Sequence, residues 1–122
     1  MKVTRISQET LDKLIKGNVN EDAQCVVKFY SNGCSYCHNL QEQYENLAEK
    51  HTNAHFYAFN IDDDPSYQNK LGFNGVPTIA LFDINPPKAR IKIMSEPANP
   101  NELTWYLPSA IDNFMKENLK DE

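Results

Sequence analysis

Residues 25–38 read CVVKFYSNGCSYCH, an apolar run that ends at a turn and is followed at once by two cysteines. The run Cys25–Tyr30 is β-prone and almost wholly apolar, which is typical of a strand buried on both faces of a sheet. Ser31-Asn32-Gly33 interrupts it, and from Cys34 onward apolar residues recur at helical spacing. The stretch therefore predicts a central strand that delivers a Cys-x-x-Cys motif to the start of a helix.

The segments on either side extend this α/β pattern. Before the central strand, residues 3–6 predict an edge strand, and Ser7 and Gly17 mark the start and end of a helix. The elements expected after the motif helix are strands at 54–59, 76–82 and 90–94, a short helix ending at Lys70, a loop at 95–108 and a terminal helix capped by Ser109 and Asp112. The strand–helix–strand unit at 25–59 predicts a right-handed parallel crossover. The last two strands, joined by a short turn, predict an antiparallel pair. We expect one α/β domain over residues 1–122 with a central mixed sheet.

Composition and charge argue against several classes of function. A chain of 122 residues, 40% of them hydrophobic, suits one modest core. The net charge of −5 leaves no basic stripe for nucleic acid, so we expect no nucleic-acid partner. No apolar run approaches the roughly 18 residues of a membrane span, and the polar N-terminus is unlike a signal peptide. We therefore expect a cytoplasmic protein with no membrane partner, and a monomer.

Several roles are open to Cys34 and Cys37. A structural disulfide fits poorly with a reducing cytosol and with an odd total of three cysteines. A zinc site needs four ligands, and the chain has no second Cys-x-x-Cys pair, only the scattered His38, His51 and His55. Simple packing within a helix is a further reading. A pair of thiols that exchange electrons accounts best for the spacing and for the position after a strand.

The start of a helix favours a reactive sulfur on Cys34. Unpaired N–H groups lie there, and the helix dipole stabilises an anion by up to about 1 kcal/mol, which is less than one pKa unit. Hydrogen bonds from backbone N–H groups must supply the remaining lowering of the Cys34 pKa that a reactive thiolate needs. We expect Cys34 to attack a substrate disulfide and the more buried Cys37 to resolve the mixed disulfide. We expect neither a metal nor a cofactor.

On these residues the chain resembles the thioredoxin family over roughly residues 1–94. The family's strand and active-site motif resemble the stretch CVVKFYSNGCSYC. The segment that leads to the family's cis-proline resembles FNIDDDPSYQNKLGFNGVPT, and the strand after it resembles IALFD. The resemblance implies a thioredoxin fold, with helices on both faces of the sheet, and a redox-active Cys34–Cys37 disulfide. It also implies a cis bond at Pro77, which would present Val76 backbone groups beside the sulfurs.

The resemblance implies a thiol–disulfide oxidoreductase that reduces or exchanges protein disulfides. Its expected electron donor is thioredoxin-reductase-like or glutathione-linked, and its expected substrate contacts are Tyr36, exposed at the helix start, with Val76 and Pro77. The alternative is a non-catalytic thioredoxin-fold module that holds extended peptides in the groove at the cis-proline. The intact cysteine pair favours the enzyme.

The chain departs from the family at several positions. Tyr30 and Gly33 stand where the family has tryptophans, and the Ser-Tyr between the cysteines is closer to the Pro-Tyr of glutaredoxins. Lys28 stands six residues before Cys34, where many thioredoxins keep a buried acid that helps to deprotonate the second cysteine. A charged lysine cannot accept that proton. We expect Lys28 to extend its ammonium group to solvent, the alternative being a position near the sulfurs.

Four further side chains have expected places. Cys25 is expected in the core, as unpaired cysteines commonly are. His38 is expected on the surface. Trp105 and Tyr106, in the loop outside the resemblance, are expected to pack in the core, the alternative being a surface patch for a partner.

Overall fold

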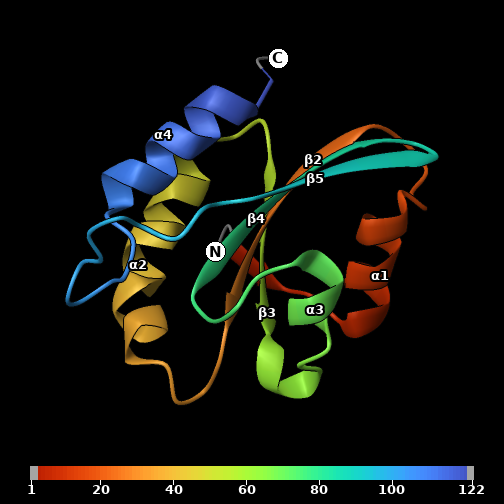
Figure 1. The fold of residues 1–122 in the computed structure, drawn as a ribbon. Coiled ribbons are helices and arrows are strands. Elements are labelled where there is room, and N and C mark those ends of the chain that lie inside the picture. The colour runs from red at the N-terminus through yellow and green to blue at the C-terminus, as the bar shows by residue number, and fades with distance from the viewer. Residues whose placement is uncertain (1–2, 121–122) are drawn as a thin grey trace.

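A five-stranded sheet organises the chain, and the computed structural model describes residues 3–120 (Figure 1). The sheet has the strand order β1-β3-β2-β4-β5. The elements in chain order are β1 (Val3–Arg5), α1 (Gln8–Lys16), β2 (Ala23–Tyr30), α2 (Ser35–Lys50), β3 (His55–Asn60), the 3-10 helix η1 (Ile61–Asp63), α3 (Tyr67–Leu71), β4 (Thr78–Asn85), β5 (Lys88–Ile93) and α4 (Pro108–Asn118).

Strand pairing confirms the predicted mixed sheet. β2 and β3 run parallel, with Cys25 opposite His55, and β1 adds to the outer edge of β3, also in parallel. β4 runs antiparallel to β2, and β5 runs antiparallel to β4. β2 is therefore the central strand, and its carboxyl end leads directly to the cysteine motif.

Helices cover both faces of the sheet, as predicted. Figure 1 shows α1 and α3 on one side and α2 and α4 on the other. Alternate side chains of β2 supply both cores, because successive residues of a strand point to opposite faces. Val27 and Phe29 pack with Leu11 of α1, whereas Val26 packs with Leu40 of α2. The two apolar layers thus hold the start of α2 against the end of β2.

Several predicted boundaries need correction. The strands expected at 76–82 and 90–94 are β4 at Thr78–Asn85 and β5 at Lys88–Ile93. β2 begins at Ala23, two residues before the apolar run, because Ala23 and Gln24 also pair with β4. The capping box at Ser109 is wrong: α4 begins at Pro108, with Leu107 as N-cap and no side-chain cap. Proline suits the first helical position because its ring fixes φ near the helical value, so Ser109 falls inside the first turn.

The turn between β4 and β5 packs against the end of α1. Pro86 and Pro87 form this turn and are joined by a cis peptide bond. Gly17 ends α1 in the left-handed conformation, at φ 69°. A Cβ atom added to Gly17 would lie 2.7 Å from the carbonyl oxygen of Pro87. Glycine is therefore required here both by its φ angle and by the close approach of the turn.

Candidate active site

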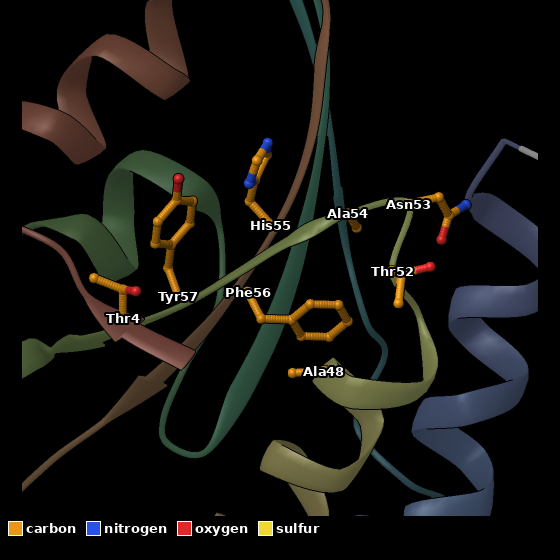
Figure 2. A pocket seen from close by; sticks show the side chains of 8 residues that line it. All are labelled: Thr4, Ala48, Thr52, Asn53, Ala54, His55, Phe56 and Tyr57. Atoms are coloured by element: carbon orange, nitrogen blue, oxygen red, sulfur yellow. The ribbon is translucent and has the colours of Figure 1, made fainter. Parts of the chain in front are cut away.

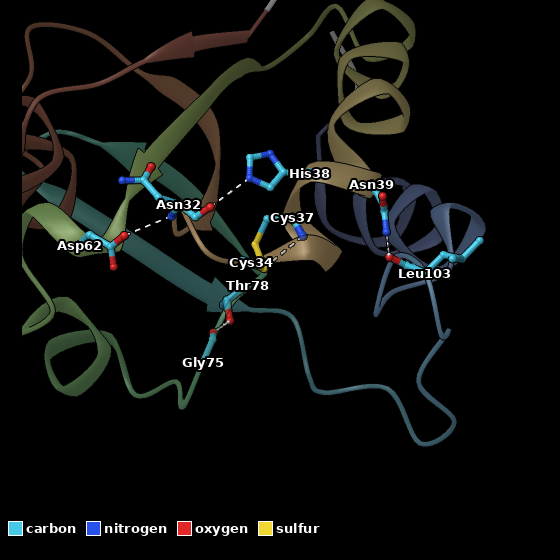
Figure 3. Close-up of a disulfide and its surroundings, with 9 residues drawn as sticks. All are labelled: Asn32, Cys34, Cys37, His38, Asn39, Asp62, Gly75, Thr78 and Leu103. Atoms are coloured by element: carbon cyan, nitrogen blue, oxygen red, sulfur yellow. Dashed lines mark hydrogen bonds between the residues drawn. A yellow bond between two sulfur atoms is a disulfide. The ribbon is translucent and has the colours of Figure 1, made fainter.

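The Cys-x-x-Cys motif lies where β2 gives way to α2 (Figure 3). The two cysteines form a disulfide, with their Cα atoms 5.3 Å apart. Cys34 is the N-cap of α2, and its Sγ accepts a hydrogen bond of 3.1 Å from the Cys37 N–H. Cys34 is half-buried, whereas Cys37 is only 3% exposed. The more accessible sulfur is thus the one at the helix N-terminus, as the sequence predicted.

The loop before the motif is held by Asn32. Its backbone N–H donates to Asp62 Oδ2 over 3.1 Å, and its side-chain oxygen accepts from Asn60 Nδ2 over 2.9 Å. Its carbonyl oxygen lies 3.1 Å from Nε2 of His38, which is exposed as expected (Figure 3). Asn32 therefore ties the end of β3 to the start of α2. The sequence predicts Asn32 only as a turn residue, because nothing local in the sequence reveals its partners.

The peptide bond between Val76 and Pro77 is cis, as expected. Phe29 near the end of β2 pairs with Thr78 at the start of β4, so Pro77 lies at the end of the sheet from which the motif departs. The Thr78 hydroxyl donates to the Gly75 carbonyl and braces the segment between them (Figure 3). The cis-proline segment and the cysteine motif therefore occupy the same end of the sheet.

The segment at residues 101–106 packs beside the motif, which the sequence did not predict. The Trp105 and Tyr36 rings lie 5.7 Å apart between centroids, and Asn39 Nδ2 donates to the Leu103 carbonyl over 2.8 Å. Tyr36 is therefore half-buried instead of exposed. Trp105 is also half-buried and packs against the core that contains Tyr106, which is 1% exposed. An indole ring thus reaches the motif from the distant loop.

The comparisons with known proteins agree with this geometry. The sequence model of the thioredoxin family matches residues 2–107. This chain belongs to the thioredoxin family. It is 29% identical over 114 residues to the chloroplastic thioredoxin-like protein CITRX of Arabidopsis thaliana, covering 93% of this chain. The chain spans 58% of the length of that relative.

Solved structures share the thioredoxin fold. The Trx4 domain of ERdj5 has a TM-score of 0.75 and 15% identity, over 98% of this chain and 97% of that one. Thioredoxin from Trypanosoma brucei brucei has a TM-score of 0.69 and 18% identity, over 99% of this chain and 93% of that one. At these identities the likeness establishes the fold.

Lys28 is the departure that most changes this thioredoxin-family site. Lys28 is only 5% exposed, so its side chain is far more buried than that of an ordinary surface lysine. Its Nζ lies 5.1 Å from the ring centroid of Tyr44 and 5.9 Å from that of Tyr30. Burial lowers the pKa of Lys28 to about 8, and the negative charge of Glu45 partly opposes this. The electron-rich ring faces partly replace the water that the cation loses.

Cys25 stays apart from the motif in this thioredoxin-family chain. It is 2% exposed and packs in the core with Leu11 and Phe82, as expected. Burial raises the pKa of Cys25 to about 11. Its thiol is therefore almost wholly protonated at neutral pH and reacts poorly as a nucleophile.

A cavity of about 430 Å³ lies beside the start of β3 (Figure 2). Its lining includes Ala48, His55, Phe56 and Tyr57, but neither cysteine of the motif. Figure 2 shows Phe56 directed toward Ala48, with His55 and Tyr57 on the other side of β3.

Within residues 3–120, no three His, Cys, Asp or Glu side chains converge as metal ligands. Over the same residues, no helix has the length and apolarity to cross a membrane.

Proposed function

We propose that this chain is a thiol–disulfide oxidoreductase that reduces or exchanges protein disulfides through Cys34 and Cys37. The observation that carries the proposal is the asymmetric pair at the start of α2. One sulfur is half-buried and accepts a backbone N–H bond, and the second is buried behind it. Membership of the thioredoxin family supports the same activity. A non-catalytic module has no need of two cysteines placed to bond to each other.

In the proposed reaction the reduced Cys34 attacks one sulfur of a substrate disulfide. The helix N-terminus stabilises its thiolate, because the Cys37 N–H already points at Cys34 Sγ. The attack releases one substrate thiolate and leaves a mixed disulfide. The Cys37 sulfur then attacks Cys34 Sγ, which forms the internal disulfide and releases the second substrate thiolate.

We further propose where the substrate lies and what reduces the protein. An extended segment of the substrate would rest against Tyr36, Val76 and Pro77, because the cis-proline segment shares the motif's end of the sheet. A thioredoxin-reductase-like or glutathione-linked donor in a reducing compartment such as the cytoplasm would return electrons to the Cys34–Cys37 disulfide.

Trapping the mixed disulfide tests the proposed activity. Cys37→Ser removes the resolving thiol, so it should accumulate a covalent complex with insulin, a model protein with disulfides, through Cys34. The complex is detected on a non-reducing gel and its linkage is mapped by mass spectrometry. Cys34→Ser is the matched control and should trap little. Equal trapping by both variants, or trapping by neither, would contradict the assigned roles.

A further inference from the structure

A small cavity connects Lys28 with the resolving cysteine. It measures about 110 Å³ and lies between the β1-β3-β2 part of the sheet and the first turns of α2, and both Lys28 and Cys37 line it. One water molecule needs roughly 10–15 Å³, so the cavity has room for water between the amine and the sulfur. The other ionisable side chains that line it are Arg5, Tyr30, His38, Tyr44 and Glu45.

The Lys28 amine is not engaged by an ion pair. Among residues 3–120, the carboxylates that lie within ion-pair distance of a cation are partnered by Lys13, Lys50, His51, Lys116 and Lys120. Lys28 Nζ is instead positioned by the faces of Tyr44 and Tyr30. Arg5 also lies over the Tyr30 ring, 5.8 Å from its centroid. The amine therefore has no ion-pair partner at the cavity, and only the ring faces and the more distant charge of Glu45, which lines the same cavity, favour its protonated form.

Burial gives Lys28 an acid–base role that a surface lysine lacks. With a pKa of about 8, in place of the ordinary 10.5, about a tenth of Lys28 is neutral amine at pH 7. An unshifted lysine would be neutral in only about one molecule in three thousand. The neutral amine accepts a proton, and the resulting ammonium stabilises a nearby thiolate.

Cys37 needs a proton acceptor of this kind. Its side chain is 3% exposed, and burial disfavours the thiolate that must attack Cys34. His38, the other nitrogen base at the cavity, is exposed, and its Nε2 lies at hydrogen-bond distance from the Asn32 carbonyl. Lys28 is the buried base on the sheet side of the cavity.

We propose that Lys28 accepts the Cys37 proton when the mixed disulfide is resolved, through water in the shared cavity. This inference rests on the proposed oxidoreductase function. The Cys37 thiol gives its proton to the neutral Lys28 amine, and the thiolate attacks Cys34 Sγ. The bond between Cys34 and the substrate sulfur breaks, and its electron pair leaves on the substrate as a thiolate. The dithiol is oxidised by two electrons, the substrate disulfide is reduced, and the Lys28 ammonium returns its proton to solvent.

Reaction of the reduced protein with the aromatic disulfide DTNB separates the two steps. Attack by Cys34 releases one 2-nitro-5-thiobenzoate in a phase whose rate rises with DTNB concentration. Attack by Cys37 releases the second in a phase whose rate does not. In the wild-type protein the second phase should accelerate with pH through an inflection near 8, as Lys28 loses its proton. Absence of both fast phases would overturn the proposed function itself.

Two substitutions of Lys28 distinguish a proton acceptor from a mere positive charge. Lys28→Met removes the amine, and Lys28→Arg keeps the charge but cannot lose its proton. Both should leave the first phase unchanged and slow the second at least about tenfold at pH 7, without the inflection near 8. Lys16→Met, the same change on α1 across the sheet, should change neither phase. A wild-type second phase in Lys28→Arg would overturn the inference and leave the proposed function standing.

A measurement on the wild-type protein guards against variants that do not fold. The NMR signal of the Lys28 side-chain carbon next to the nitrogen should titrate near pH 8 in the oxidised protein. A titration near pH 10.5, the ordinary value for lysine, would overturn the inference whatever the variants do.

Discussion

At the scale of single residues, the three cysteines of this chain lie in three different surroundings. Cys34 is half-buried at a helix N-terminus, Cys37 is buried one turn further on, and Cys25 is sealed in the core of the α1/α3 face. The same thiol therefore has three different reactivities, because solvation and hydrogen bonding set the fraction of thiolate.

Alkylation of the reduced protein should rank the three thiols. Iodoacetamide should label Cys34 first and Cys25 last, with mass-mapped peptides as the readout. With a pKa of about 11, Cys25 holds only roughly one part in ten thousand as thiolate at pH 7. Unfolding in denaturant is the control, since it should make the three rates similar. Similar rates in the folded protein would contradict the nucleophilic role of Cys34.

At the scale of elements, Asp112 joins α4 to the end of α2. It accepts hydrogen bonds from Lys50 over 2.9 Å and from His51 over 2.7 Å, and Lys116 pairs with it from the next turn of α4. The bond from the Lys50 ammonium, then those from His51 and Lys116, hold the pKa of this carboxyl well below its usual range. The far end of the motif helix is thereby fixed to the last helix.

Asp112→Asn should weaken this junction and show a defined dependence on pH. Because the folded-state pKa is lower than the unfolded one, the stabilisation is complete above about pH 5 and is lost as the pH falls below about 4. Urea unfolding at pH 7 should show a loss on the order of 1 kcal/mol. The difference between the two proteins should shrink toward pH 2. An equal difference at both pH values would show that packing, and not charge, is responsible.

The contact between α1 and the β4–β5 turn gives a second prediction at this scale. Gly17→Ala should lower the free energy of unfolding by about 2 kcal/mol or more, since the left-handed φ alone costs an alanine about 1–2 kcal/mol. Gly72→Ala is the matched control: Gly72 has φ 79°, but a Cβ there would meet nothing within 4 Å. If urea unfolding shows the same loss of unfolding free energy for Gly17→Ala and Gly72→Ala, the β4–β5 turn moves to accommodate the added methyl group without a further loss of stability.

At the scale of the whole molecule, the sheet separates two independent cores. Ile79 and Ile84 are both fully buried on β4, yet Ile79 packs on the α2/α4 face and Ile84 on the α1/α3 face. Ile79→Val and Ile84→Val should each cost about 0.5–1.5 kcal/mol. The double variant should show their sum within about 0.5 kcal/mol in urea unfolding. A coupling above about 1 kcal/mol would show that strain passes through the sheet.

Local patterns in the sequence were enough to predict the sheet, the helix order and the cysteine motif. The apolar run at 25–30 and the helical spacing after Cys34 each arise within a few residues, so both could be read directly. The position of Lys28 could not, because it depends on the ring of Tyr44, which another element brings over the strand. The contact of Trp105 with Tyr36 likewise depends on how a loop far along the chain returns to α2.

The place of Trp105 makes the protein its own optical probe. Trp105 is the single tryptophan of the sequence, and its ring contacts Tyr36, the residue immediately before Cys37. All indole fluorescence of the molecule therefore originates one side chain away from the motif. Excited at the long-wavelength edge, where indole absorbs and the six tyrosines do not, an unlabelled sample consequently reports on the cysteine end of the molecule.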